Sequence, residues 1–235
     1  LSLAKENNNK LVSGFQLRHS KVVDTIKDIC IKYLDSLPYM ISVDGGANCL
    51  VTNGIHYLDL AFSIFGSSPL EVSSQLNMNN INPRGKHLGF WEGNANWKFN
   101  DNKLLSISFS NMSSVAITCK IFAQKGYLTI SDKGPHIEIL TYIRNKKEVE
   151  NDPRIIRTGE VELVDSSIIK KHSLLNVVKE TIIDLHNSNI EFDHERESIA
   201  CKNLIYALIA NDDKRTILLP FDKNHSLYNF DWPIS

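Results

Sequence analysis

The chain has 235 residues, enough for one large domain or one domain and a fraction, and its hydrophobic fraction of 42% can supply a core. Its 26 Lys and Arg nearly cancel its 27 Asp and Glu, and a formal charge of -1 argues against a nucleic-acid binder or a polybasic membrane-surface protein. No apolar run reaches the about 20 residues that span a bilayer, and the start lacks a signal-peptide pattern. We therefore expect a cytoplasmic protein with neither a nucleic-acid nor a membrane partner.

The first elements alternate between helical and strand patterns. Residues 1–8 read as the end of a helix, and residues 10–16 have the β-branched and aromatic content of a strand. Ser20 suits the N-cap of a following helix. The apolar residues of that helix recur at helical spacing and are Val23, Ile26, Ile29, Cys30, Tyr33 and Leu34.

A strand over residues 39–43 comes next, and a turn over 44–48 opens a second helical stretch. This stretch passes His56 and ends at Phe65, with Gly66 as its C-cap.

After Pro69 the pattern becomes one of short strands separated by Asn, Gly, Asp and Ser turns. The alternating segments are 70–77, 104–109, 115–122, 127–131 and 136–141. Residues 77–82 look low in complexity, but the tract is short.

The last third returns to helical periodicity. From residue 172, Leu175, Val178, Ile182 and Leu185 share one face, which predicts a buried helical stripe. A second helix from about residue 194 turns Ile199, Leu204, Leu208 and Ile209 inward, and a strand over 216–219 ends at Pro220. Grouped strands and grouped helices predict an α+β fold, with a large open, mostly antiparallel sheet and helices on one face.

Several kinds of chemistry are missing from the sequence. It contains no Gly-x-Gly, no Walker motif, no Gly-x-Ser-x-Gly and no His-Glu-x-x-His. Gly45-Gly46 precedes a helix, where it is either a phosphate cradle or a sharp turn. Four widely spaced cysteines form no Cys-x-x-Cys pair, so we expect buried free thiols and no metal site, although two disulfides are formally possible.

His56 is the histidine that stands out. It lies near a predicted helix start, where the positive end of the helix dipole favours the neutral imidazole that can accept a proton. Asp59 follows one helical turn later. The alternative is a core histidine that is hydrogen-bonded to a backbone carbonyl.

Residues 45–60, Gly-Gly-Ala-Asn-Cys-Leu-Val-Thr-Asn-Gly-Ile-His-Tyr-Leu-Asp-Leu, closely resemble the second signature of the Gfo/Idh/MocA oxidoreductases. Residues 3–19 resemble the last Rossmann helix and strand of that family, and residues 61–72 its helix end and first sheet strand. Residues 203–220 resemble its closing helix and strand. The resemblance implies a Rossmann tail over 1–18, with the rest of that domain absent, and a C-terminal α+β domain over 19–235.

The resemblance also implies a function. The chain would be the C-terminal part of an NAD(P)-dependent oxidoreductase that transfers a hydride to or from a sugar, sugar acid, polyol or nucleotide sugar. NAD or NADP would bind the intact parent, and we expect none to bind this chain alone. His56 would be catalytic, and Arg18, Thr52, Asn53 and Asp59 would bind substrate, unless Arg18 instead forms an ion pair with Asp59.

Two departures from the family pattern bear on activity. The family's Glu-Lys-Pro motif, whose Lys is usually catalytic, would lie before the first residue. Thr52 stands where the family often has an Asp, and a threonine cannot hold an imidazolium by charge. A non-catalytic binding or oligomerisation module therefore remains an alternative, as does an NAD-using glycosidase within the same fold.

The resemblance also favours assembly. Family members commonly pair through the open sheet face, so we expect a homodimer or homotetramer. The aromatic residues Phe90, Trp91, Trp97, Phe99, Phe109 and Phe122 crowd a region that one helical layer would leave partly exposed. Phe90, Trp91 and Trp97 would either stack on a sugar or lie in the core or an interface.

Overall fold

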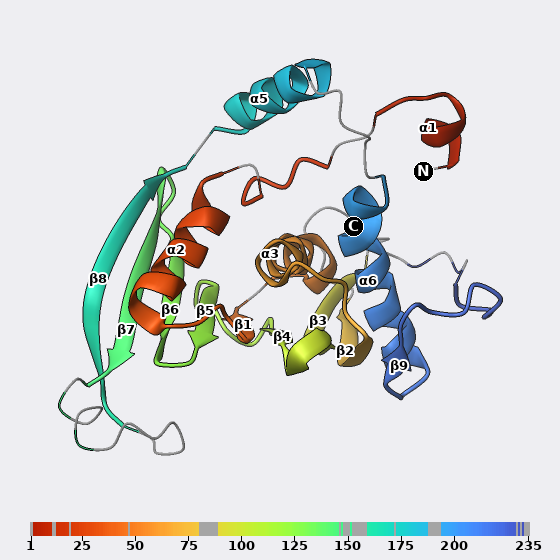
Figure 1. Ribbon diagram of the computed structural model, residues 1–235. Helices are drawn as coiled ribbons and strands as arrows, with labels where there is room; N and C mark the ends of the chain where they lie inside the picture. The colour runs from red at the N-terminus through yellow and green to blue at the C-terminus, as the bar shows by residue number, and fades with distance from the viewer. Residues whose placement is uncertain are drawn as a thin grey trace.

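A single open sheet carries the helices on one of its faces (Figure 1). The computed structural model describes residues 2–10, 13–18, 20–46, 48–79, 89–145, 147, 151, 159–171, 173–187, 194–228, 230 and 232. Nine strands among these residues follow the order β8-β7-β6-β5-β1-β4-β3-β2-β9. Their bounds are β1 Met40–Gly45, β2 Glu71–Asn79, β3 Phe90–Lys98, β4 Leu104–Phe109, β5 Thr118–Ala123, β6 Gly126–Asp132, β7 His136–Arg144, β8 Val161–Lys170 and β9 Ile217–Leu218.

The sheet is antiparallel at every described pairing except one, where β1 runs parallel to β4. Alternation explains its two faces: Leu105, Ile107 and Phe109 of β4 are buried, whereas the residues between them are only partly buried. The predicted α+β architecture is therefore confirmed.

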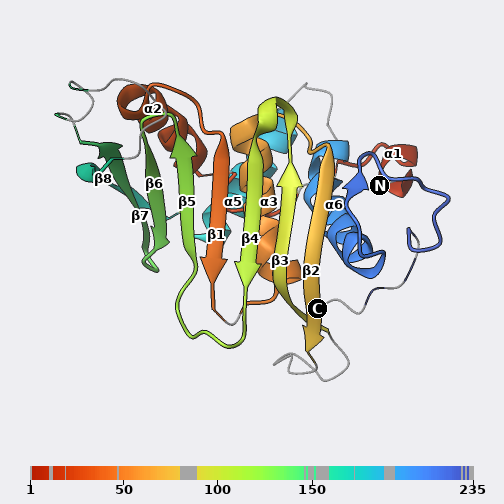
Figure 2. The same ribbon diagram turned by 90° about the horizontal axis from the view of Figure 1, so that it is seen from below.

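Among the described residues, three helices pack on the buried face: α2 (Val22–Leu34), α3 (Ile55–Phe65) and α6 (His194–Asp212). Figure 2 shows the strands in front of them from the open side. α5 (Leu174–Asn187) lies farther from the sheet, and the short α1 (Ser2–Glu6) lies at the periphery. α3 ends at Gly66, whose φ of 69° is the left-handed cap conformation that the sequence predicts. α2 begins one residue later than a Ser20 cap requires, although the Ser20 hydroxyl accepts from Val22 N at 3.4 Å.

The strand predicted over residues 10–16 is wrong for the described part of that range. Residues 13–15 have no regular structure and residues 16–18 form a turn. The segment binds α6 instead, because Ser13 donates its amide to Glu197 Oε2 at 2.6 Å and its hydroxyl to the Glu197 carbonyl at 2.8 Å. Side-chain partners thus replace the strand partners that the pattern suggested.

The aromatic residues mostly face the helices and not the open side. Trp97 and Phe99 are fully buried, and Trp97 Nε1 donates to the Asn203 carbonyl on α6 at 3.2 Å. Phe99 packs edge-on against Phe65 of α3, with ring centroids 4.9 Å apart. Trp91 and Phe109 are buried too. The expected exposed aromatic patch is therefore wrong for these four residues, which are core.

Two further expectations need correction. α5 forms as predicted, but the expected buried stripe is largely exposed: Leu175 is 76% exposed and Ile182 is 60% exposed, whereas Val177 is buried. Among the cysteines, Cys30, Cys49 and Cys119 are buried free thiols, but Cys201 is exposed.

Candidate functional site

A pocket of about 430 Å³ lies beside the part of the chain that the sequence singles out. The segment before α2, the start of α3 and strands β5 to β7 contribute to its wall, together with the residue that follows β8. Its polar lining comes mainly from Gln16, Asn48, Asn53, His56, Asp132 and Lys171.

A π-helical turn carries Asn53 and leads directly into the helix that carries His56. This turn, η1 (Leu50–Gly54), runs directly into α3, because Gly54 has helical angles and Leu50 and Val51 are buried against the core. π-helical turns are rare and occur often at functional sites. Asn53 on this turn and His56 on α3 both line the pocket.

His56 has an accessible imidazole whose edge packs on the Phe15 ring, with centroids 5.9 Å apart. Within the described residues neither ring nitrogen has a hydrogen-bond partner, so the histidine is not tied to a backbone carbonyl there. Burial lowers the pKa of His56, and the charge of Asp59 opposes that shift. The helical backbone already begins at Leu50, so His56 does not lie at the first turn, where the helix dipole acts most strongly.

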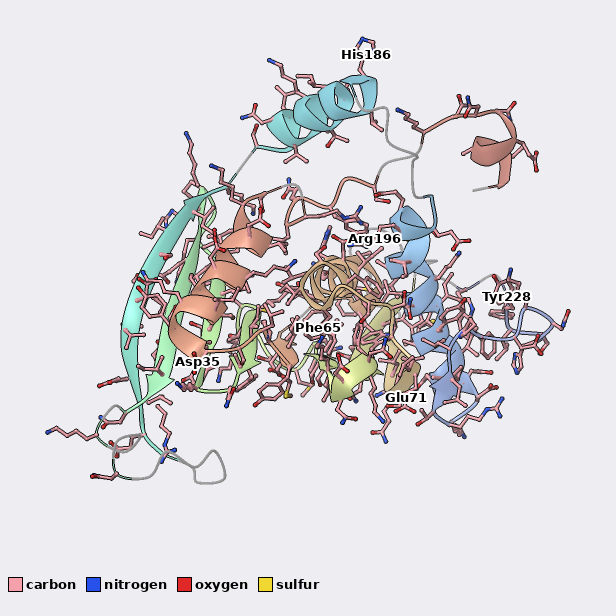
Figure 3. All side chains as sticks on the ribbon, in the orientation of Figure 1. Asp35, Phe65, Glu71, His186, Arg196 and Tyr228 are labelled. Carbon is pink, nitrogen blue, oxygen red and sulfur yellow. The ribbon has the colours of Figure 1, made fainter. Side chains whose placement is uncertain are left out.

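Arg18 and Asp59 form an ion pair away from the pocket lining. Asp59 is fully buried and accepts from Arg18 Nε at 3.0 Å and from Arg196 Nη1 at 3.2 Å. Glu197 also pairs with Arg18. Arg196 lies where α6 approaches α3 (Figure 3). This four-residue cluster joins the segment before α2 to α3 and α6.

Thr52 also stays outside the pocket lining. Its hydroxyl donates to Asn53 Oδ1 at 3.2 Å and, more weakly, to the Cys49 carbonyl at 3.4 Å. Of the five predicted site residues, the structure therefore brings His56 and Asn53 into the pocket, and it places Thr52, Arg18 and Asp59 behind its wall.

The sequence did not reveal several residues of the pocket wall. Asp132 ends β6 and Lys171 follows β8, and the two meet only because β7 lies between these strands. Lys171 Nζ contacts Asp132 Oδ2 at 2.5 Å. Burial acts to raise the pKa of Asp132, but the bonds from Lys171 and from the Gly134 amide outweigh it and lower that pKa. Tyr57 also lines the pocket, and burial raises its pKa.

The Gly45-Gly46 turn does not fit a phosphate cradle. A Cβ on Gly46 would lie 2.3 Å from the Ser113 carbonyl oxygen, and the Gly46 amide already donates to the Val115 carbonyl at 2.8 Å. A Cβ on Gly45 would meet Ile117 Cγ1 at 2.9 Å. The two glycines therefore allow the 113–117 segment to pass close to the turn, and the Gly46 amide is already used by a carbonyl of that segment.

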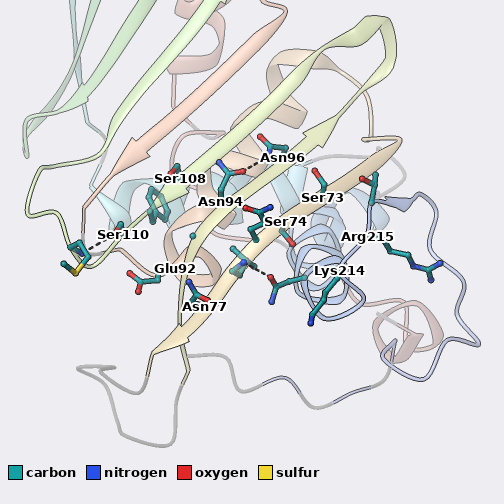
Figure 4. Close-up of a pocket in the computed structure, with 17 residues that line it drawn as sticks. Ser73, Ser74, Asn77, Glu92, Asn94, Asn96, Ser108, Ser110, Lys214 and Arg215 are labelled. Atoms are coloured by element: carbon teal, nitrogen blue, oxygen red, sulfur yellow. Dashed lines mark hydrogen bonds between the residues drawn. The ribbon is translucent and has the colours of Figure 1, made fainter.

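A larger groove of about 1270 Å³ lies over β2, β3 and β4, where Ser73, Asn94, Asn96 and Ser108 line it (Figure 4). Asn96 donates to Asn94 at 2.6 Å. Serine and asparagine side chains are poor proton carriers, and the carboxylate of Glu92 in this groove already accepts from Asn79 and from the Asn111 amide. The His56 pocket is therefore the better candidate for chemistry.

No described helix has both the length and the apolar character needed to cross a membrane. No protein-family model and no curated protein matches the sequence. One solved structure with a similar fold is an NAD-binding protein from Listeria innocua, with 14% identity and a TM-score of 0.65 over 96% of this chain and 68% of that one. Another is an aldose-aldose oxidoreductase from Caulobacter crescentus complexed with glycerol, with 13% identity and a TM-score of 0.64 over 93% of this chain and 66% of that one.

A super-repressor mutant of Gal80p from Saccharomyces cerevisiae is also similar (12% identity, TM-score 0.62, 98% of this chain and 69% of that one). The chain thus spans about two thirds of the length of these structures. At such low identity the likeness establishes the fold. The chain has the fold of the C-terminal domain of the Gfo/Idh/MocA-type NAD(P)-binding oxidoreductases.

Proposed function

We propose that this chain is the substrate-binding and assembly part of a cytoplasmic NAD(P)-dependent oxidoreductase that acts on a sugar-like compound. The observation that carries the proposal is the His56 imidazole, which lines a pocket of mixed polar and apolar character and has both nitrogens unbonded among the described residues. The fold shared with an aldose-aldose oxidoreductase supports the reaction class. In this proposal residues 1–18 belong to the nucleotide-binding domain and residues 19–235 form the α+β domain.

His56 would handle the proton of the reacting hydroxyl. A neutral imidazole has one free acceptor nitrogen, and the lowered pKa of His56 keeps the ring neutral near pH 7. Gln16, Asn48 and Asn53 would orient the substrate, because each amide offers both donors and an acceptor.

The Gly45-Gly46 turn does not have the form of a cofactor site. A pyrophosphate needs backbone amides that point outward from a glycine turn, whereas the Gly46 amide donates to the Val115 carbonyl. NAD or NADP would therefore bind elsewhere in the complete protein. The NAD-binding protein from Listeria innocua, which shares this fold, supports that part of the proposal.

Substitution of His56 tests the proposal. We expect His56→Ala to lower the turnover of the complete protein by roughly 10²-fold or more, the scale of a lost proton-transfer group, as followed by NAD(P)H absorbance. His56→Gln should be equally slow, because an amide cannot accept the proton, and added imidazole should partly restore the alanine variant.

His186→Ala is the matched control, since His186 is exposed on α5 and lies outside the pocket. Turnover of a folded His56→Ala protein within a few-fold of the native rate would leave His56 with a structural role only.

A non-catalytic binding module is the second candidate. It is favoured by the similarity to a super-repressor mutant of Gal80p and by Thr52 in the place of an acidic residue. Ligand binding to the His56 pocket without any cofactor-dependent turnover by the complete protein would support this candidate over the first.

A further inference from the structure

The ion pair between Lys171 and Asp132 lies at the same pocket as His56 but has no place in the proton step. The pair is fixed from several sides. Asp132 Oδ1 accepts the Gly134 amide at 2.9 Å, and the Lys171 amide donates to the Pro135 carbonyl at 3.0 Å. The two charged groups therefore keep a set position at the ends of β6 and β8.

Both charged groups remain reachable from the pocket. The Lys171 side chain is 29% exposed and that of Asp132 is 59% exposed, and both line the cavity. An ammonium has three donors, and among the described residues Asp132 takes one of them. The carboxylate oxygens each keep a further lone pair. The pair thus presents a donor and an acceptor side by side.

Two neighbouring hydroxyls of a sugar or polyol match this arrangement. One hydroxyl can donate to the Asp132 carboxylate while the next accepts from the Lys171 ammonium, and both bonds are strengthened by charge. Gln16, Asn48 and Asn53, which also line the pocket, carry amides that can pair with further hydroxyls.

The charge of the pocket points to a neutral ligand. Lys171 and Asp132 are the charged residues among those described in the lining, and their charges cancel. The lowered pKa of His56 adds no cation near neutral pH. A carboxylate or phosphate would have to compete with Asp132 for Lys171 and would lie beside a like charge.

We infer that Lys171 and Asp132 determine substrate specificity by binding two adjacent hydroxyls of a neutral aldose or polyol, and that they disfavour the corresponding sugar acid. The inference rests on the proposed function and narrows its substrate class. The alternative is a purely structural surface ion pair that links the end of β6 to the end of β8.

The test uses the isotope-labelled 235-residue chain, with sorbitol, D-glucose and D-gluconate as probes and NMR chemical shifts as the readout. We expect sorbitol and glucose to shift the His56 ring signal together with the Gly134 and Lys171 amides. Gluconate should bind several-fold more weakly. Lys171→Met should weaken sorbitol binding by about tenfold, the effect of losing one hydrogen bond to a charged group.

Lys98→Met is the matched control, because Lys98 pairs with Glu71 at 3.0 Å outside this pocket. It should bind sorbitol like the native chain, and the amide spectrum checks that both variants fold. Tighter binding of gluconate than of sorbitol, unchanged affinity in Lys171→Met, or no shift with either neutral probe would overturn the inference.

The outcome is separable from that of the proposed function. Lys171-dependent sorbitol binding together with normal turnover of His56→Ala would retain the specificity pair and remove the catalytic histidine. Slow turnover of His56→Ala together with Lys171-independent binding would do the reverse.

Discussion

Two opposing effects of unequal size act on the pKa of His56. Burial lowers its pKa from the usual 6.5, and Asp59 raises it by a smaller amount. Because the folded chain then holds fewer protons than the unfolded chain, the free energy of unfolding should fall as the pH drops below 6.5 toward the folded pKa.

We therefore expect NMR titration of the ring to give a pKa below 6.5. In Asp59→Asn this pKa should fall further, since the carboxylate charge that favours the imidazolium is gone and the Arg18 and Arg196 charges remain. Asp35→Asn, which removes an exposed carboxylate paired with Lys125, should leave it unchanged. An unchanged ring pKa in Asp59→Asn would show that the charge of Asp59 does not act on His56.

Residue types alone left the role of Arg18 open between a substrate anchor and an ion pair. The structure shows the ion pair, with Asp59 and Glu197 both occupying the guanidinium. Glu197 lies on α6, far away in sequence, so local spacing gave no sign of this partner. Asn53 and His56 were named from the family resemblance, and their separation by three residues lets one helical run place both side chains at the pocket.

At the scale of elements, the close packing of the Gly45-Gly46 turn predicts a loss of stability on substitution. Gly46→Ala should lower the free energy of unfolding by about 1–3 kcal/mol, because the new methyl group would overlap the backbone carbonyls of Ser113 and Val115. Gly14→Ala, where nothing lies within 4 Å of the added Cβ, is the control and should change little. Denaturant unfolding midpoints measure both, and equal stabilities would mean that the 113–117 segment is easily displaced.

Sequence periodicity predicted the elements that bury one clear face. α2, α3, α6, β4 and β7 were expected because their apolar residues repeat at the helical or strand period. β3 and β8 were missed, since Asn and Gly interrupt the first and many residues of the second are exposed. The buried stripe expected on α5 was wrong, because amphipathic spacing indicates a helix but does not supply the surface that covers it.

The candidate site divides in the same way. His56 and Asn53 lie on one local run, which a linear motif can represent. Asp132 and Lys171 come together only through the pairing of β6, β7 and β8, so no spacing within the sequence brings them together.

At the scale of the whole molecule, the open sheet face still favours the proposed assembly, but through other aromatic residues than the sequence suggested. Its β2–β4 half is lined by Ser and Asn (Figure 4), whereas the other half carries a row of aromatic rings. Tyr127 stacks on Tyr142 with centroids 5.0 Å apart, and Phe122 lies 5.7 Å from Tyr127. These three rings are half-buried, and we propose that a second copy packs on this row, because apolar patches that solvent can reach usually mark interfaces.

Sedimentation at micromolar concentration tests this assembly. The native chain should sediment as a dimer or tetramer, and Phe122→Lys should shift it toward the 26.6 kDa monomer, because a charge would be buried in an apolar contact. Ser108→Lys, on the polar half of the same face, should remain assembled. A native chain that sediments as a monomer would refute the proposal.

The central place of β1 has a consequence for how the chain is made. β1 is the first strand in the sequence, yet its partners β4 and β5 begin only at Leu104 and Thr118. At about 5–20 residues per second a ribosome needs roughly 3–12 s to extend the chain from Gly45 to Leu104. During that interval neither of the strands that flank Ile41 and Val43 in the folded sheet has been made, so the sheet cannot yet cover these apolar side chains on the nascent chain.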